Sequence, residues 1–302
     1  MRTVKNERQR LHTGSVIRAH ILTGLAVCIS LSLFAAHPFI DNAGMTVEQR
    51  FIPPSGYART YADETSYAVY LRRLPLLAAG VPVKYFDGTV KPNPNQKIYT
   101  AVVKLNIGFE DLQQAPEACM RLRGEYLFAQ QQYGQIAFTI NSHNHERISY
   151  VKWIEGLKLV IDGKQHWTKS PTEVDRYATF WRYLNFVFTY ADKETLLNDV
   201  QRASLYDISP GDMFIQAAHS GHVVVVVDVA QNPKTGDRVF LLAQSCQPAQ
   251  LLHILVNPSD PNLSPWYSIS AIEDKLATPE FMFYKRDLHR FHENQETVSS
   301  KK

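Results

Sequence analysis

The sequence has few cysteines and lacks the short motifs that mark common cofactor sites. Only three cysteines occur in 302 residues, and no two of them form a C-x-x-C pair. H-E-x-x-H, P-loop and G-x-G-x-x-G patterns are also absent, so zinc, nucleotide and dinucleotide sites have no motif support. An excess of one charge is missing too, because the net charge is only +3 and the charges are scattered. We therefore expect no cofactor, no metal and no nucleic-acid partner.

Apolar residues, in contrast, are plentiful. The chain is 45% hydrophobic and 11% aromatic, which is enough for a sizeable core and unlike a disordered sequence. No internal repeat divides the chain. We expect a single domain at residues 61–290, with an insertion at about 144–205, a linker-like extended lead at 37–60 and a disordered polar tail at 291–302.

Residues 1–36 have the pattern of an export signal. Basic residues at the start precede the nearly uncharged apolar run AHILTGLAVCISLSLFAA at 19–36. The run is almost long enough to span a bilayer, so an uncleaved membrane anchor is the alternative. Both interpretations place the folded part outside the cytoplasm, in the periplasm or attached to the cell envelope. Membrane contact would then come only through this segment.

Hydrophobic periodicity and turn residues predict an α+β protein. The expected helices lie at 64–75, 116–133, 172–191 and 193–203; the expected strands lie at 98–108, 134–143, 212–217, 221–230, 238–246 and 281–288, with a hairpin at 81–93. Five consecutive valines predict that strand 221–230 is buried on both faces. Helices followed by a terminal antiparallel sheet are typical of the α+β class. Gly124 either weakens the second helix by about 1 kcal/mol or marks close backbone packing.

A histidine stands at the mouth of the valine-rich strand. If QNPKTGD at 231–237 closes a near-symmetric turn, the segment AQSCQ at 243–247 lies opposite His222. Gln244, Ser245 or Gln247 can then hold one ring nitrogen of His222. A partner of this kind fixes the tautomer and orientation of the ring, as a catalytic base requires.

Cys119 is the best candidate for a nucleophile that such a base would activate. It lies near the start of the expected helix 116–133, where the helix dipole lowers the pKa of a thiol. Glu117, two residues earlier, opposes formation of the thiolate. Backbone N–H groups of the same turn can also hold an oxyanion.

Two segments carry a resemblance to known hydrolases. PGDMFI at 210–215, followed by SGHVVVVVDV at 220–229, resembles the corresponding strands of papain-like NlpC-type and CHAP-type cell-wall hydrolases. The resemblance implies a papain-like core in which a Cys opens a helix, a His begins the second core strand and a polar residue on the next strand orients the His. Cys119, His222 and Gln244 occupy these places. The usual Asp-Cys-Ser context is replaced here by Ala118-Cys119-Met120, and Gln is an uncommon orienting residue.

A wider resemblance covers most of residues 50–290. RFIPPSGYAR, CMRLRGEYL, SPGDMFI, GHVVVVVDV, LLAQSCQPAQ and TPEFMF together resemble a family of secreted bacterial proteins that is known only as a domain of unknown function. This resemblance implies no activity.

The leading functional hypothesis is hydrolysis of an amide in cell-wall peptide or a similar envelope substrate. Cys119 would attack, His222 would move the proton and Gln244 would hold His222. Arg121 and Arg123 would contact a substrate carboxylate and His219 would gate the cleft, although solvated or ion-paired side chains are the structural alternative for all three. The second hypothesis is a binding module that keeps the fold, with the aromatic region 150–190 contacting the ligand. Acyl transfer to or from lipid is a third.

The two cysteines outside the export signal leave alternatives open. Cys119 is equally compatible with an inert buried thiol, because free cysteine is among the most buried residue types. A Cys119–Cys246 disulfide is compatible with an oxidising compartment. Cys246 is the weaker nucleophile candidate, since the end of a strand lacks a helix dipole. An open groove that brings the Cys119 sulfur beside the His222 ring would favour the hydrolase.

Overall fold

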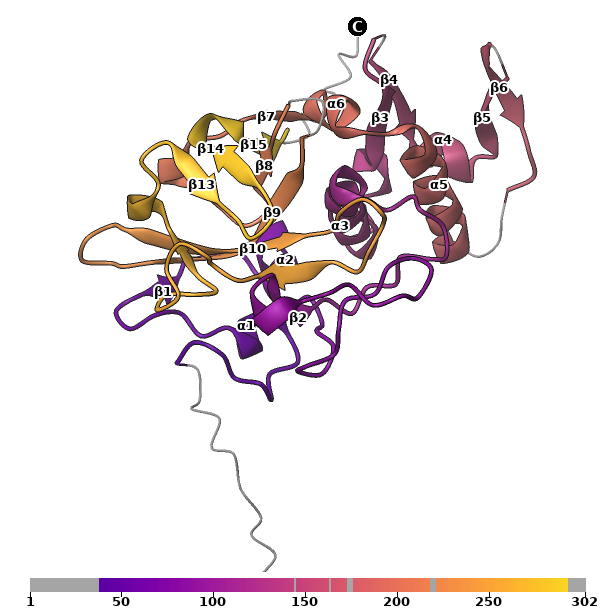
Figure 1. The fold of residues 1–302 in the computed structure, drawn as a ribbon. Coiled ribbons are helices and arrows are strands. Elements are labelled where there is room, and N and C mark those ends of the chain that lie inside the picture. The colour runs from indigo at the N-terminus through magenta and orange to yellow at the C-terminus, as the bar shows by residue number, and fades with distance from the viewer. Residues whose placement is uncertain (1–37, 144, 163, 173–175, 218–220, 293–302) are drawn as a thin grey trace, which may run out of the picture. The chain divides into compact units, whose positions relative to one another are not determined.

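The computed structural model describes residues 38–143, 145–162, 164–172, 176–217 and 221–292. In this part of the chain, nine strands form one antiparallel sheet, whose main path runs β2-β11-β10-β9-β8-β15-β7 (Figure 1). These strands are β1 Ala58–Arg59, β2 Tyr99–Val102, β7 Val200–Arg202, β8 Met213–Ile215, β9 Val223–Gln231, β10 Arg238–Gln244, β11 His253–Leu255, β12 Tyr267–Ser268 and β15 Leu288–Phe291. The shortest two lie off the main path, with β1 paired to β9 and β12 paired to β10.

The remaining described strands form three separate antiparallel pairs. They are β3 Ala137–Asn141 with β4 Glu146–Ser149, β5 Leu157–Ile161 with β6 Gln165–Lys169, and β13 Lys275–Ala277 with β14 Met282–Tyr284. The helices are α1 Val47–Arg50, α2 Tyr67–Arg72, α3 Ala115–Ala129, α4 Tyr150–Ile154, α5 Arg176–Tyr190 and α6 Lys193–Leu197. This mixture of helices and antiparallel strands confirms the α+β class.

Strand β9 is buried on both faces, as its run of valines predicts. Val223, Val225 and Val227 belong to a core that includes residues of α2, α3 and α5. Val224 and Val226 belong to a second core on the other face, which includes Leu276 of β13 and Phe283 of β14. Helices therefore cover one side of the sheet and the C-terminal strands cover the other.

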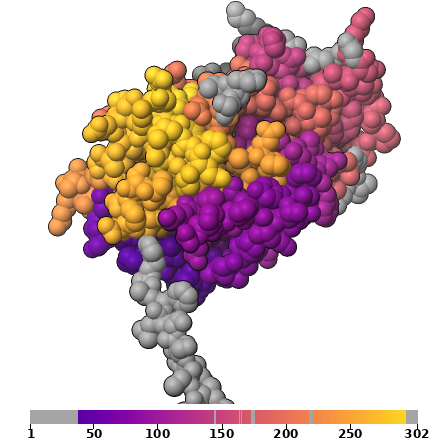
Figure 2. Space-filling view, in the orientation of Figure 1, coloured from indigo at the N-terminus to yellow at the C-terminus, as the bar shows by residue number. Residues whose placement is uncertain are grey.

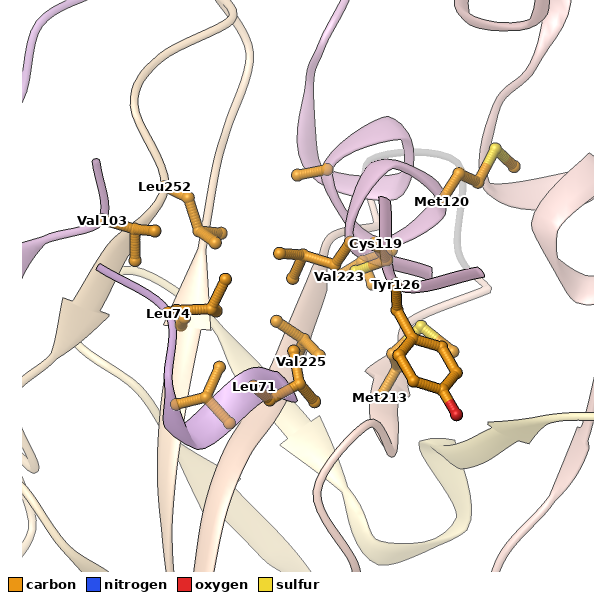
Figure 3. Packing of buried hydrophobic residues seen from close by; sticks show 14 of the residues in the cluster. Leu71, Leu74, Val103, Cys119, Met120, Tyr126, Met213, Val223, Val225 and Leu252 are labelled. Carbon is orange, nitrogen blue, oxygen red and sulfur yellow. The ribbon is translucent and has the colours of Figure 1, made fainter. Parts of the chain in front are cut away.

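Helix α3 packs between β9 and α5. Its Cys119 and Met120 lie in the same core as Val223 and Val225 (Figure 3). On the opposite side, a Cβ added to Gly124 would come within 3.3 Å of Phe180 in α5. Gly124 therefore marks a close approach of two helices, which supports the second of the two interpretations of this glycine.

A buried ion-pair cluster locks β9 to the N-terminal part of the domain. The pairing of β10 with β9 shifts register between Leu241 and Leu242, and this β-bulge interrupts the alternation of side chains along β9. Asp228 follows the bulge and pairs with Leu241. The carboxylate is fully buried and accepts from Arg59 Nε at 2.7 Å and from Arg72 Nε at 2.6 Å. Two cations thus compensate the burial of one charge, which is expensive when a carboxylate is unpaired.

The structure differs from expectation at the edges of the domain. The segment expected to be a linker-like lead packs on the domain, because Val47 and Phe51 are fully buried and β1 pairs with β9. The helix expected at 193–203 ends at Leu197, and residues 200–202 pair with β15 instead. Phe291, expected in the tail, is the last residue of β15. Residues 1–37 and 293–302 lie outside the described residues, and no described helix is long and apolar enough to cross a membrane.

We expect Asp228→Asn to lower the free energy of unfolding by about 3 kcal/mol or more, because the buried Arg72 and the partly buried Arg59 would lose their charged partner. Urea denaturation followed by circular dichroism measures the change. The control is Glu64→Gln, which breaks the ion pair between Glu64 and Arg73 on the surface. That variant should lose less than about 1 kcal/mol. Similar losses in the two variants would contradict the role given to Asp228.

Candidate functional site

His222 lies directly before β9, and its ring is held on two sides. The Nε2 atom of His222 lies 3.1 Å from Oε1 of Gln244, the last residue of β10. The ring also stacks on Phe281, with 3.8 Å between ring centroids and 12° between planes. His222 is 5% exposed. The sequence therefore located both His222 and its polar partner on the neighbouring strand.

The carboxylate of Glu280 determines, through Gln244, which nitrogen of His222 carries the proton. Gln244 Nε2 lies 2.7 Å from Oε2 of Glu280, and a carboxylate can only accept, so the amide nitrogen must face Glu280. The amide oxygen of Gln244 then faces His222, and an oxygen of this kind can only accept from Nε2–H. The unprotonated nitrogen of His222 is consequently Nδ1, which has no hydrogen-bond partner within the described residues.

The same network continues to a second histidine and a lysine. His253 Nδ1 donates to the carbonyl of Leu251 at 2.8 Å, which leaves its Nε2 free to accept from Gln244 Nε2 at 3.4 Å. Glu280 is paired with the Lys91 ammonium at 2.8 Å. This pair joins the C-terminal segment to the segment around residue 91, and the corresponding yellow and purple surfaces meet in Figure 2.

Both imidazoles are neutral near pH 7. Burial lowers the pKa of His222 to about 4, although the Gln244 hydrogen bond opposes this change. Burial likewise lowers the pKa of His253 to about 3, against the hydrogen bond to Leu251. The neutral His222 ring can therefore accept a proton or a hydrogen bond at Nδ1.

A cavity of about 220 Å³ separates His222 from the start of α3. It is lined by Gln114, Ala115, Pro116, Glu117, Ala191, Asp192, Lys193, Glu194, Gly221, His222 and Gln247. The first turn of α3, the first turn of α6 and the mouth of β9 therefore face one space. Residues 218–220, which precede Gly221 in the sequence and include the predicted gating residue His219, lie outside the described residues.

Glu117 is the second ionisable group with unusual surroundings in this cavity. The residue is the third of α3 and is only 4% exposed. Burial raises the pKa of its carboxyl group to about 8, against the backbone N–H groups of Glu117 and Gln114, while the charges of Asp192 and Asp111 raise the pKa further. Near pH 7 the carboxyl group is mostly protonated. Its Oε2 has no hydrogen-bond partner in the described chain.

Cys119 does not line the cavity beside His222. Its side chain is 2% exposed, and the structure contains no hydrogen bond between it and His222 among the described residues. Burial raises the pKa of the Cys119 thiol above its usual range, and Glu117 raises it further. The helix geometry explains this, because residues two apart on a helix point about 200° apart. Since Glu117 lines the cavity, Cys119 faces the core.

The other residues predicted for the site have structural partners elsewhere. Arg121 is 2% exposed, donates from Nε to Glu125 at 2.7 Å and stacks on Trp181 at 4.2 Å. The guanidinium group of Arg123 lies 5.3 Å from the ring of Tyr67, and the residue lines a separate cavity of about 40 Å³. Neither arginine lines the cavity of His222.

The described part of the chain offers no disulfide and no metal centre. Cys119 and Cys246 are both free thiols, so they do not form the disulfide that was one alternative. Burial also raises the pKa of Cys246, which is half-buried. No group of three or more His, Cys, Asp or Glu side chains within the described ranges could hold a metal ion.

Comparison with protein families gives a match over most of the chain. A model of the family described as "Domain of unknown function (4846)" matches residues 47–290. The chain belongs to this family. No curated protein matches the chain, and no solved structure matches it. The residues matched by the family include α3, β9 and β10, so the cavity is part of the family domain.

We expect native Cys119 to react with iodoacetamide far more slowly than Cys246, since Cys119 is sealed in the core while Cys246 is half-buried. Mass spectrometry of peptides after timed labelling at pH 7.5 measures both rates. Labelling in urea provides the control and should make the two rates equal. Rapid labelling of native Cys119 would show that its sulfur opens to water.

We expect the pH dependence of stability to report Glu117. Between pH 4.5 and about 8 the folded carboxyl group keeps a proton that the unfolded chain releases, so stability falls as pH rises. Glu117→Gln removes this titration but leaves Asp111 and Asp192 in place. From pH 5 to pH 8 the wild type should lose about 1 kcal/mol or more relative to the variant in urea denaturation. Parallel curves would mean that Glu117 has an ordinary pKa.

Proposed function

We propose that the protein is an exported binding module for cell-wall peptide, and that the cavity between α3 and β9 receives one amide group of that ligand. The observation that carries this proposal is the pair of unpartnered polar atoms at the cavity residues Glu117 and His222. Near neutral pH, Glu117 offers an O–H donor and His222 Nδ1 offers an acceptor. A carbonyl oxygen and an N–H group, the two polar parts of an amide, complement this pair.

The order of the elements around the cavity supports a papain-like core as the finer description of the fold. A helix starts at the cavity, His222 precedes a core strand and Gln244 ends the next strand. NlpC-type and CHAP-type hydrolases have the same order, and they act on cell-wall peptides, which is why we propose this ligand class. In our proposal, the carboxyl group of Glu117 takes the place of the catalytic cysteine thiol of those hydrolases.

Thiol hydrolysis is less compatible with the cavity than binding is. A thiol mechanism requires the Cys119 sulfur to reach the bound amide, whereas the side chain is buried in the core with a raised pKa. The same requirement applies to acyl transfer through Cys119. Glu117 and His222, in contrast, both line the cavity.

Export is part of the proposal and is supported by the sequence of residues 1–36. The basic residues and the apolar run of that segment match a secretory signal or a membrane anchor. Both would deliver the domain to the periplasm or the cell envelope, where peptidoglycan is the abundant source of exposed peptides.

We expect the full chain to sediment with purified peptidoglycan and to bind the soluble stem peptides released from it. His222→Ala and Glu117→Ala should each lower the affinity by about fivefold to tenfold, because each removes about one hydrogen bond to the ligand. Isothermal titration calorimetry measures the affinity.

The matched control is Tyr206→Ala, because Tyr206 is 85% exposed and does not line the cavity. This variant should bind as the wild type does. Absence of binding by the wild type, or equal losses in all three variants, would rule out the proposed site.

A further inference from the structure

We propose that Glu117 and His222 also hydrolyse the bound amide, with water as the nucleophile and without any thiol. The proposal rests on the binding function above, because the amide must first occupy the cavity. It assigns two roles to two side chains that line the same space but come from different elements. Glu117 acts as the acid that activates the carbonyl group, and His222 acts as the base that activates water.

The base role follows from the fixed orientation of the His222 ring. Gln244 holds Nε2, Glu280 holds Gln244, and Phe281 stacks on the ring face, so the direction of Nδ1 is set before any ligand binds. A preorganised base loses less entropy when the reaction begins. Gln244 is here a positioning residue, because it acts through His222.

The acid role follows from the unpaired oxygen of Glu117. A buried polar atom without a partner is unfavourable, so a ligand that supplies an acceptor relieves this penalty. Glu117 is held in the first turn of a 15-residue helix, and Oε2 is its orphaned atom. A carbonyl oxygen in the cavity provides the acceptor and is polarised by the O–H group.

The reaction balances with one water molecule and no other reagent. His222 Nδ1 takes a proton from water as the water oxygen bonds to the amide carbon, and the carbonyl oxygen takes the proton of Glu117. The C–N bond then breaks with its electron pair on nitrogen, which receives the proton from His222. The hydroxyl group returns its proton to Glu117 as the C=O bond reforms. The products are a carboxylic acid and an amine.

The surroundings set both groups in the required protonation states between about pH 4 and pH 8. Burial keeps Glu117 protonated up to a pKa of about 8, and burial keeps His222 unprotonated down to a pKa of about 4. Two groups whose environments separate their pKa values in this way are suited to acid and base roles. The charged and titratable groups around the pair are Asp111, Asp192, Lys193, Glu194, Lys91, Glu280, Cys119, Cys246 and His253.

The decisive experiment compares a cysteine-free chain with two cavity variants on purified peptidoglycan. The cysteine-free protein is the full chain with Cys28→Ala, Cys119→Ala and Cys246→Ala. Newly released amino groups are quantified over time at pH 6.5, and the soluble products are identified by mass spectrometry. Glu117→Gln keeps a neutral hydrogen-bonding group but cannot donate its proton, and His222→Gln lacks the basic nitrogen. Thermal unfolding verifies that each variant is folded.

We expect the cysteine-free protein to release amino groups within about twofold of the wild-type rate, whereas Glu117→Gln and His222→Gln should each lose about 100-fold or more. Glu117→Gln should still sediment with peptidoglycan, which separates chemistry from binding. The wild-type rate should fall below about pH 4 and above about pH 8, following the pKa values of the two groups.

Other outcomes overturn the proposal in distinguishable ways. A wild type that sediments with peptidoglycan but releases no amino groups leaves the binding function standing and removes the hydrolysis. A wild type that does neither removes both. Loss of hydrolysis in the cysteine-free protein, with binding retained, would assign the chemistry to a thiol instead of to water.

Discussion

The burial of β9 on both faces is the constraint on which the site depends. Val223 to Val227 contact the helix side and the C-terminal side of the sheet alternately, so the strand cannot slide or rotate without exposing one of the two cores. The bulge beside Leu242 and the two arginines on Asp228 fix its register further. His222 lies immediately before this strand, so the packing of the strand in the interior fixes the position of His222. A residue in a surface loop would not have this precision.

Much of the central sheet was predictable because its residues carry strong local patterns. The valine run, the turn at 231–237 and the position of Gln244 led to the β9–β10 hairpin and to the contact between His222 and Gln244, both of which the structure contains. The partners from distant parts of the chain were not predictable. Glu280 contacts Gln244 and Phe281 contacts His222 through tertiary packing, and Lys91 pairs with Glu280. No periodicity in the sequence indicates such contacts.

Cys119 and Glu117 show why the prediction of the site succeeded only in part. The sequence places both near the start of one helix, and the chemistry of thiols drew attention to Cys119. Which of the two faces the cavity depends on the rotational setting of α3 against β9, and this setting depends on packing at Gly124 and Phe180. An acidic residue in the first turn of a helix usually serves to stabilise the helix end, so the sequence did not indicate a role for Glu117 in the site. Its burial and the unpartnered Oε2 atom indicate that role only in the structure.

The stacking of Phe281 on His222 and the hydrogen bond from Gln244 to Glu280 have a consequence for how the site is assembled. Both partners come after β11 in the sequence, so the residues up to β11 lack the groups that orient the imidazole. The residues that line the cavity all lie between Gln114 and Gln247, yet two groups that hold the His222 ring and its partner Gln244 come from outside this range. The His222 ring therefore gains its fixed orientation only when the segment of Glu280 and Phe281 packs against the sheet.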